Sequence, residues 1–551
     1  MNIDNNLIFI KGEDKTASVE SYRYDPSRHT VYIRYANQYG HLKEYPYNAS
    51  NVYISKDPKI ITLEERIALK NGLPLSGAKY LQGFGQYYRI IYGTGYKEVV
   101  RASSIQIIES ALRIKESRDC FEYLKHIADK TGLIVNGSNI LAKNYARIGV
   151  VREDSVLAAF LSGKYEDKPS KNNSTVVYPF GFNLSQKIAI DNALNHRISI
   201  IEGPPGTGKT QTILNIIANA VMRGESVAVV SSNNSATANV LEKLKKYGVD
   251  FIAAPLGNST NKEAFIESQN PVLPDMSRWT DNTNDLSALR QDEVELDRML
   301  KLQNELSAIT AEQNRLEKEY VHFGDYYKTL TFQGALPRFA DRISAAKILA
   351  FIAEYELLLP KEPKIGFFKK LILGFTYGIK DFRFYGKAVD IVVPYCQNIY
   401  YNRRLSEIKA RKTQLQAILK SYDFDFKMKQ YSAMSMRAFK ASLAKKYGSA
   451  RTRPYFESDD LWKRSDEFIR NYPVVLSTTY SLRASLSSSF VYDYVIVDEA
   501  SQVDLATGAL ALSCAKKTVI VGDLKQLPNV VDRAQESITD WVFGQYHLPE
   551  T

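Results

Sequence analysis

The sequence has 551 residues, enough for about three or four domains, and its 44% hydrophobic and 24% charged residues are ordinary for a globular protein. No stretch approaches the ~20 consecutive apolar residues of a membrane-spanning helix, and the N-terminus lacks the basic and long apolar regions of a secretory signal. Cys120, Cys396 and Cys514 stand far apart, which fits a reducing compartment and no zinc site. We therefore expect a cytoplasmic protein that does not associate with a membrane.

The first part of the chain alternates aromatic or branched side chains with polar ones, for example in HTVYIRYA and YYRIIYGTGYKEVV. This alternation is typical of half-buried β-strands, so we expect a β-rich accessory domain over residues 1–115. Its tyrosines can stack on bases, although packing within a sheet is the simpler interpretation. Residues 116–175 have a mainly helical pattern and end in EDKPSKNNST, a polar run typical of a linker.

Residues 203–210 read GPPGTGKT and match the phosphate-binding loop (P-loop, or Walker A motif) GxxxxGK[ST]. An apolar run typical of a buried strand precedes the loop, and an amphipathic run typical of a helix follows it. Glycines let backbone amides approach phosphate oxygens, and the start of a helix adds partial positive charge. Lys209 is expected to reach the β- and γ-phosphates of ATP, and Thr210 to offer its hydroxyl to Mg²⁺. The predicted nucleotide contacts are Gly203, Pro204, Pro205, Gly206, Thr207, Gly208, Lys209, Thr210 and Gln211.

A second apolar run, DYVIVDEASQ, ends in the acidic pair Asp498 and Glu499. A carboxylate at the C-terminal end of a buried strand can hold Mg²⁺ through water, and its neighbour can orient or deprotonate the attacking water. Acidic pairs at strand ends are common, so this pair indicates a nucleotide site only because the sequence also contains a P-loop. We predict that Asp498 binds Mg²⁺ and that Glu499 is catalytic.

A third apolar run, TVIVGDLKQLPNVV, leads into Asp523 and Gln526. In this order GPPGTGKT, DEAS and GDLKQLP resemble the motifs of superfamily 1 helicases, in particular the 1B branch that contains the nonsense-mediated-decay helicase. The resemblance implies a RecA-like ATPase in which Gln526 senses the γ-phosphate and couples hydrolysis to the grip on nucleic acid. The usual motif has a proline where this chain has Leu524, while Asp523 and Gln526 agree with it.

The resemblance extends to three polar segments. FNLSQKIAIDNAL is similar to the adenine-contacting segment, which implies that Gln186 contacts the base. SVAVVSSNNSATANVLEKL and VVLSTTYSL are similar to segments that bind the nucleic-acid backbone. Taken alone, such clusters are also typical of helix caps. The implied backbone contacts are Ser232, Asn233, Asn234, Ser477, Thr478 and Thr479.

Six apolar runs with helical patterns between them predict one parallel sheet, the RecA-like α/β fold that the resemblance implies. The runs lie at 198–202, 226–231, 250–255, 474–478, 493–498 and 517–522. The P-loop and the acidic pair are further apart in the sequence than the intervening strands and helices require, so we predict an insertion. The predicted ATPase domain covers 176–257 and 471–551, and the predicted insertion covers 258–470.

The insertion contains two heptad patterns, which predict an antiparallel coiled-coil stalk. The first seam consists of Met299, Leu302, Leu306, Ile309, Leu316, Tyr320 and Phe323. The second consists of Leu405, Ile408, Leu415, Leu419 and Tyr422. The run KIGFFKKLILGFTYGIKDFRF lies between the two patterns, so we expect it to form a basic, aromatic tip.

Positive charge is concentrated in this insertion. The chain carries +11 in total, whereas residues 361–453 hold 21 Lys and Arg against 6 Asp and Glu, a local +15 that leaves −4 elsewhere. Such an excess with interleaved tyrosines is typical of a surface for a polyanion; a solvated helical face and a tip that touches a membrane surface are the alternatives. In the helicases that the chain resembles, an insertion here lies over the nucleic-acid channel. We predict contacts from Lys369, Lys370, Arg403 and Arg404.

Helicases of this superfamily bind ATP between two α/β domains, and the second domain supplies arginines that stabilise the transferring phosphate. This sequence ends about twenty residues after its third motif. The resemblance therefore covers the first domain, and we expect either a fragment or a partner chain that supplies the second. Two functions remain open: a helicase-type ATPase that acts on DNA or RNA, with a single strand as the expected form, and a nucleotide-dependent nucleic-acid clamp that barely hydrolyses ATP.

Overall fold

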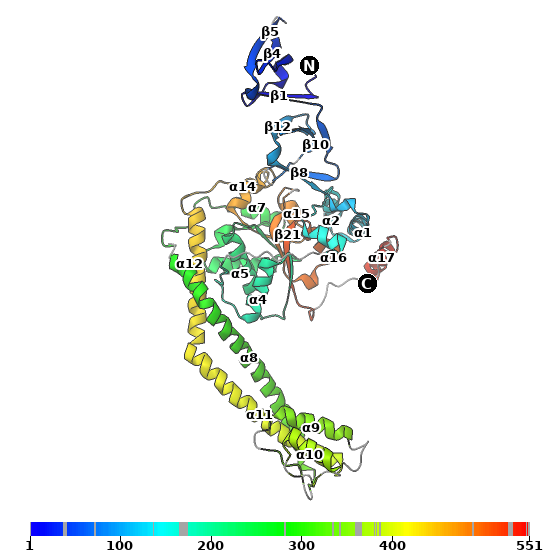
Figure 1. The fold of residues 1–551 in the computed structure, drawn as a ribbon, viewed down its shortest axis with the longest axis vertical. Helices are drawn as coiled ribbons and strands as arrows, with labels where there is room; N and C mark the ends of the chain where they lie inside the picture. Colours follow the sequence, from blue (N-terminus) through cyan, green and yellow to red (C-terminus); the bar gives the residue numbers. More distant parts are fainter. Residues whose placement is uncertain are drawn as a thin grey trace. The chain divides into compact units, whose positions relative to one another are not determined.

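The computed structural model divides the chain into two compact units, drawn in Figure 1. Unit 1 consists of Met1–Phe180, Gln186–Asp281 and Phe439–Thr551, and unit 2 of Gly181–Ser185 and Asn282–Ala438. The structure describes residues 2–36, 41–70, 73–75, 77–135, 137–164, 175–279, 283–332, 336–340, 343–358, 366–379, 381, 383–384, 387–487, 490–526, 533–546 and 548.

A six-stranded parallel sheet forms the centre of unit 1, in the order β16-β21-β20-β17-β19-β18. Its strands are β16 (Ile198–Glu202), β17 (Val227–Ser231), β18 (Ala253–Pro255), β19 (Val474–Thr478), β20 (Tyr492–Val497) and β21 (Ala515–Gly522). Each lies within a few residues of a predicted strand, and the predicted parallel α/β fold is confirmed. Strands from before and after the inserted unit 2 are interleaved in the sheet, so the two stretches of sequence fold as one domain.

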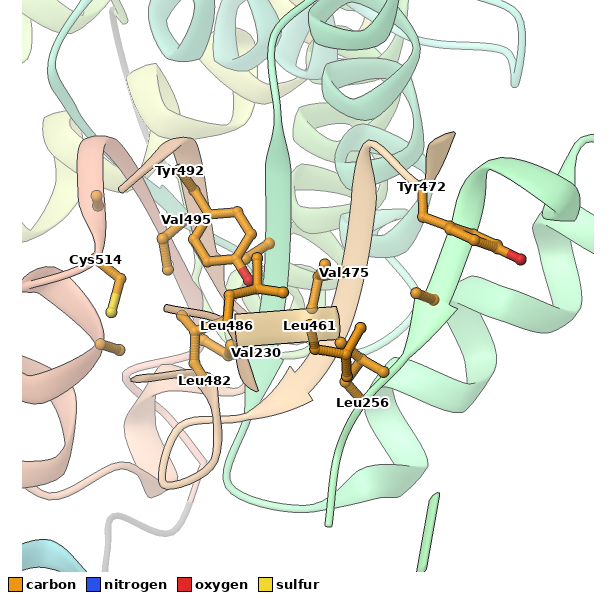
Figure 2. Packing of buried hydrophobic residues seen from close by; sticks show 14 of the residues in the cluster. Val230, Leu256, Leu461, Tyr472, Val475, Leu482, Leu486, Tyr492, Val495 and Cys514 are labelled. Atoms are coloured by element: carbon orange, nitrogen blue, oxygen red, sulfur yellow. The ribbon is translucent and has the colours of Figure 1, made fainter. Parts of the chain in front are cut away.

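The strands are apolar because helices cover both faces of the sheet. β17 is buried at every position, and successive side chains along it point to opposite faces. α5 (Lys209–Met222) packs against β17 with its apolar side buried. The other face meets the cluster in Figure 2, where side chains from neighbouring strands gather with those of the covering helices. The residues labelled there are Val230, Leu256, Leu461, Tyr472, Val475, Leu482, Leu486, Tyr492, Val495 and Cys514.

Antiparallel strands make up the N-terminal part of unit 1, in sheets ordered β2-β1-β6, β3-β4-β5, β12-β11-β10-β7 and β13-β8-β9. Their aromatic side chains pack on one another: the rings of Phe9 and Tyr87 stack with centroids 4.5 Å apart. The strands are β1 (Asn6–Ile10), β2 (Glu13–Asp14), β3 (Val19–Asp25), β4 (Thr30–Ala36), β5 (Leu42–Asn48), β6 (Val52–Lys56), β7 (Lys59–Thr62), β8 (Arg66–Lys70), β9 (Leu73–Pro74), β10 (Ala78–Phe84), β11 (Tyr87–Tyr92), β12 (Lys97–Arg101) and β13 (Ile105–Glu109).

Helices from the segment before the P-loop pack directly on the ATPase core. α1 (Lys115–Thr131), α2 (Ile140–Ala146) and α3 (Val156–Ser162) share a buried cluster with α16 (Leu505–Leu512) and α17 (Arg533–Phe543). The Tyr145 hydroxyl donates a hydrogen bond to the Ala506 carbonyl oxygen at 2.6 Å. This segment is therefore held firmly against the far end of the chain.

Two long helices, α8 (Thr283–Lys328) and α11 (Val389–Tyr422), lie side by side in unit 2, green and yellow in Figure 1. Tyr320 donates a hydrogen bond to Asn398, whereas Glu305, fifteen residues earlier, pairs with Arg411. The contacts advance in opposite directions along the two helices, so the pair is antiparallel. α9 (Ala345–Leu358) and α10 (Phe367–Tyr377) share a second buried cluster with α11. Among the described helices, none combines the length and apolarity needed to cross a bilayer.

Arg404 is part of the contact between α8 and α11. Its guanidinium donates hydrogen bonds to both carboxylate oxygens of Glu312, at 2.7 and 2.9 Å. It also lies 3.6 Å from Glu407 on its own helix. The structure thus gives this predicted nucleic-acid residue a role in holding the helical pair together.

We expect Arg404→Glu to lower the stability of unit 2 by about 1 kcal/mol, because a bidentate ion pair is replaced by facing carboxylates. Thermal unfolding followed by circular dichroism measures the effect. The swap Glu312→Arg with Arg404→Glu should recover most of the stability. Arg403→Glu is the control, since among the described residues its side chain has no ion pair. Equal destabilisation in both single variants without recovery in the swap would contradict the pairing.

Candidate nucleotide and nucleic-acid site

The predicted motifs lie along one edge of the sheet. All six strands run in the same direction, so their carboxyl ends share that edge. The register sets Glu202 beside Gly522, Val497 beside Val230, and Ser231 beside Thr478. The sheet therefore brings the P-loop, the acidic pair and the two polar segments together although they are far apart in the sequence.

The P-loop has the backbone that its glycines predict. Gly206 and Gly208 have φ angles of +84° and +87°, in the left-handed region that favours glycine. A Cβ at Gly208 would lie 2.1 Å from Nε2 of Gln186, so a side chain there would displace the Gln186 amide from the loop. Lys209 begins α5, and its Nζ donates a hydrogen bond to the Gly203 carbonyl oxygen at 2.8 Å. The lysine therefore folds back over the loop where phosphates are predicted to bind.

Gln186 lies against the P-loop, as its predicted role requires. It is buried on α4 (Leu184–Asn195), and its Nε2 donates to the Thr207 carbonyl oxygen at 3.1 Å and to Gln211 at 3.3 Å. Gln211 in turn donates to the Phe180 carbonyl oxygen. Pro204, Pro205 and Thr207 are exposed on the loop, and Thr210 is half-buried in the first turn of α5. The adenine contact itself stays a prediction.

Asp498 and Glu499 follow β20 directly. The backbone N–H of Asp498 donates to the Val230 carbonyl oxygen at 2.7 Å, and its carboxylate accepts from the Glu499 N–H at 3.0 Å. Burial raises the pKa of Asp498 and the Glu499 charge adds to the rise, while the Glu499 N–H and the nearby Lys209 oppose it. Glu499 has a φ of +52°, and its Oε2 is buried without a hydrogen-bond partner among the described residues.

These groups fit Mg²⁺ and a polyphosphate. Mg²⁺ prefers oxygen ligands and commonly takes one or two from the protein, with the rest from water and phosphate. The Asp498 carboxylate and the Thr210 hydroxyl are of that kind. A buried carboxylate with a raised pKa and an unpartnered carboxylate oxygen beside it are the features that a cation would satisfy.

Gln526 belongs to a short turn after β21. Asp523 is buried and accepts a hydrogen bond from the Lys525 N–H at 2.9 Å, and the Gln526 N–H donates to the Asp523 carbonyl oxygen at 3.2 Å. Leu524, the departure from the usual motif, is 83% exposed, so its side chain contributes little packing. The Gly203 N–H donates to the Gly522 carbonyl oxygen at 3.1 Å, so this turn adjoins the P-loop. Leu527 and Pro528 lie outside the described residues.

In the polar segment after β17, one side chain caps a helix and the others do not. Asn233 caps α6 (Asn234–Lys246) by accepting from the Ser235 and Ala236 N–H groups at 3.1 and 3.4 Å. Ser232 donates to Oε1 of Gln502 at 3.4 Å, and Gln502 lies three residues after Glu499. Oδ1 of Asn234 is buried without a partner among the described residues. The capping interpretation therefore holds for Asn233, and the nucleic-acid role stays a prediction for all three.

The segment after β19 is more deeply set than its polar character suggests. Ser477 is buried and donates to the Leu256 carbonyl oxygen at 3.4 Å. Thr478 accepts from the Ser481 N–H at 3.2 Å. Thr479 is buried, and its Oγ1 has no partner in the part of the chain that the structure describes. Thr479 is thus the member with an unused hydroxyl.

The predicted basic contacts of the insertion lie on two helices of unit 2. Lys369 and Lys370 are half-buried on α10, and Arg403 is half-buried on α11 beside the ion-paired Arg404. Phe368 and Phe375 on α10 are 81% and 84% exposed. Exposed aromatic side chains therefore lie beside the two lysines on α10, and their contact with nucleic acid stays a prediction.

A basic cavity of about 530 Å³ at the same sheet edge was not predicted. It lies between α2, α7 (Ser259–Glu267) and the turn that joins β19 to α15 (Leu482–Ser485), and Lys143, Arg147 and Lys262 line it. The available signal was the spacing of four between Lys143 and Arg147, which sets both on one side of a helix.

The comparisons with known proteins agree with this arrangement. Residues 181–533 match the family model described as an AAA domain. DNA polymerase alpha-associated DNA helicase A of Schizosaccharomyces pombe is 31% identical over 142 residues, 25% of this chain and 21% of that protein. The putative ATP-dependent RNA helicase ECM32 of Saccharomyces cerevisiae is 44% identical over 64 residues, 11% of this chain and 6% of that protein. DNA-binding protein SMUBP-2 of Mus musculus is 44% identical over 68 residues, 12% of this chain and 7% of that protein.

The chain thus spans about a fifth or less of the length of these relatives. The family model, in contrast, covers more than half of this chain, including the P-loop, the acidic pair and the described part of the third motif. The chain therefore belongs to the AAA domain family of superfamily 1 helicases.

Proposed function

We propose that this chain is an ATP-binding, helicase-type P-loop ATPase that acts on DNA or RNA. The observation that carries the proposal is the meeting of the P-loop and the acidic pair at one sheet edge, where the Lys209 charge acts on the buried Asp498. The names of the relatives, which include a DNA helicase, a putative ATP-dependent RNA helicase and a DNA-binding protein, support it. They favour hydrolysis over a clamp that only binds nucleotide.

In the proposed reaction the chain's own groups bind and orient the nucleotide. The amides around Gly206 and the N-terminus of α5 bind the phosphates, and Lys209 exchanges the Gly203 carbonyl for a phosphate oxygen. Thr210 and Asp498 would hold Mg²⁺, whose charge would stabilise the negative charge of the phosphates. The unpartnered carboxylate of Glu499 accepts a proton from the attacking water.

The proposal includes a link between the nucleotide and the strand. The turn that carries Gln526 follows Gly522, whose carbonyl oxygen accepts a hydrogen bond from Gly203 of the P-loop. Ser232, at the predicted nucleic-acid edge, bonds Gln502 in the turn that begins with Glu499. A single strand bound at Ser232, Asn234 and Thr479 would thus act on the turn that carries the catalytic carboxylate.

We also propose the domain layout that the sequence predicts. Residues 1–115 form an accessory β-rich domain and 116–175 a connector. The ATPase domain covers 176–257 and 471–551, and its insertion at 258–470 forms an antiparallel coiled-coil stalk. A second RecA-like domain, supplied by a longer protein or by a partner chain, completes the site. The proposed location is the cytoplasm.

Glu499→Gln should lower nucleic-acid-stimulated ATP hydrolysis by about 10²- to 10⁴-fold, because the general base is removed while size and hydrogen bonding are kept. ATP binding should change little. Phosphate release measures turnover, and calorimetry measures binding. Glu536→Gln, at an exposed position on α17, is the matched control and should leave both unchanged. A wild type that binds ATP with negligible turnover, unaffected by the change, would favour the clamp.

Lys209→Ala should weaken Mg-ATP binding about 10- to 100-fold, since the variant has no ammonium to donate charge-assisted hydrogen bonds to phosphate. Calorimetry with the full chain measures the affinity. Lys245→Ala, which removes an exposed lysine from the last turn of α6, is the control. Equal affinity in wild type and Lys209→Ala would show that the nucleotide does not bind at the P-loop.

Charge reversal at Lys369, Lys370 and Arg403 should weaken binding of a single-stranded oligonucleotide and flatten its salt dependence by ~0.7 for each phosphate that is no longer neutralised. Arg404 is left out because its reversal would disturb the helical pair. Fluorescence anisotropy at several salt concentrations measures both quantities. Lys301→Glu, at an exposed position on α8, is the control. Unchanged affinity and slope would show that the basic surface does not bind the strand and is only solvated. If anionic vesicles then retain the protein, the surface contacts a membrane instead.

A further inference from the structure

The basic cavity lies at the end of the sheet edge remote from the P-loop. The P-loop follows β16 at one side of the sheet, whereas the cavity is walled by residues that follow β18 and β19 at the other. Its volume is about 530 Å³. Three cationic side chains line it, from Lys143, Arg147 and Lys262, and no Asp or Glu is among its lining residues in the part of the chain that the structure describes.

The cavity wall formed by α2 is held in place by the ATPase core. Asn144 donates a hydrogen bond from Nδ2 to the Tyr480 carbonyl oxygen at 3.2 Å, and Tyr145 is anchored to Ala506. Both side chains are buried. Lys143 and Arg147, one turn apart, are exposed and line the cavity. The helix that carries the two cations is therefore fixed to the ATPase core.

Among the described residues, none of Lys143, Arg147 and Lys262 takes part in an ion pair. Burial lowers the pKa of the Lys262 ammonium, and the charge of Asp459 offsets this only in part. Like charges around one cavity repel one another, so an anion that enters gains from all three.

The third wall adds polar groups suited to the same anion. Asn258 caps α7, and Ser259 begins that helix, whose N-terminus carries partial positive charge. Gly257 brings the backbone so close to Asn234 that a Cβ would lie 2.3 Å from its Oδ1. The wall of the cavity thus adjoins the polar segment already predicted to bind a nucleic-acid backbone.

An aromatic ring lies beside two residues that line the cavity, Arg147 and Ala484. The guanidinium of Arg147 is 5.9 Å from the ring centroid of Trp462. The indole Nε1 donates to the Ala484 carbonyl oxygen at 3.3 Å, which fixes the edge of the ring, and the side chain is 41% exposed. A fixed, half-exposed indole beside cations is a platform on which a base can stack.

We propose that this cavity holds a phosphodiester group of a nucleic-acid strand and that Trp462 stacks on a neighbouring base. The inference rests on the proposed function, and it names Lys143, Arg147, Lys262 and Trp462 as its strand-binding residues. The cations bind the phosphate. The ring distinguishes a strand from a free anion, because inorganic phosphate has no base to stack on the indole.

The test measures the binding of a fluorescent single-stranded oligonucleotide to the full chain by anisotropy across a range of salt concentrations. Lys143→Gln, Arg147→Gln and Lys262→Gln, combined, should lower the slope of log affinity against log salt by about 2, at ~0.7 for each cation removed from the phosphate. Lys115→Gln, which removes an exposed lysine on α1, is the control and should keep the wild-type slope.

The ring is tested separately from the charge. Trp462→Leu should weaken strand binding about tenfold, whereas Trp462→Phe should stay close to wild type because the aromatic face is kept. A merely structural role through the bond to Ala484 would make both variants equally weak, since neither has the indole N–H. That result would overturn the stacking assignment.

The outcomes separate this inference from the proposed function. Mg-ATP binding at the P-loop should stay unchanged in every variant, which also shows that the variants fold. If wild type binds the strand and the triple variant keeps its salt slope, the cavity assignment is wrong while the ATPase proposal stands. If inorganic phosphate displaces the strand as well as a second strand does, the cavity binds a free anion and the strand assignment is overturned.

Discussion

The parallel alignment of six strands is the constraint on which the rest of the molecule depends. β17 is hydrogen-bonded to β20 on one side and to β19 on the other, which joins strands from before and after the inserted unit. Because parallel strands share one carboxyl edge, every loop that follows a strand opens at that edge. The buried, near-continuous apolar strands fix this alignment, since a slip in register would expose valines and bury polar loop residues.

Local backbone chemistry explains why so much of the fold and of the nucleotide site could be predicted. Gly206 and Gly208 occupy positive φ angles that their residue type anticipates, and the apolar runs have the length of buried strands. The basic cavity escaped prediction because its walls meet only through tertiary contacts. Asn144 and Tyr480, whose hydrogen bond closes it, are 336 residues apart, and no local period links them.

The polar and charged candidates show where a sequence pattern is ambiguous. Asn233 fits a helix cap and a phosphate contact equally well in the sequence, and in the structure it caps α6. Arg404 belongs to a basic run, yet Glu312 on the facing helix occupies its guanidinium. In both cases the hydrogen-bond partner decides the role. For Asn233 it is a backbone N–H two residues away. For Arg404 it is a carboxylate on the facing helix, and the heptad pattern predicts that helix but not how the two helices align.

Two aspartates on one strand of the sheet show how structure and function can be told apart by their partners. At the start of β20, desolvation acts to raise the pKa of Asp493, but hydrogen bonds from Lys516 and from the Ser226 N–H, each 2.8 Å long, outweigh it and lower the pKa. Just past the other end, Asp498 is at least as buried, and there the Glu499 N–H and the Lys209 charge do not outweigh desolvation, so its pKa is raised. Asp493 has its hydrogen-bond partners within the fold, whereas Oε2 of Glu499 has none among the described residues. Burying these carboxylates costs free energy, and the proposed binding of Mg²⁺ and nucleotide would offset that cost.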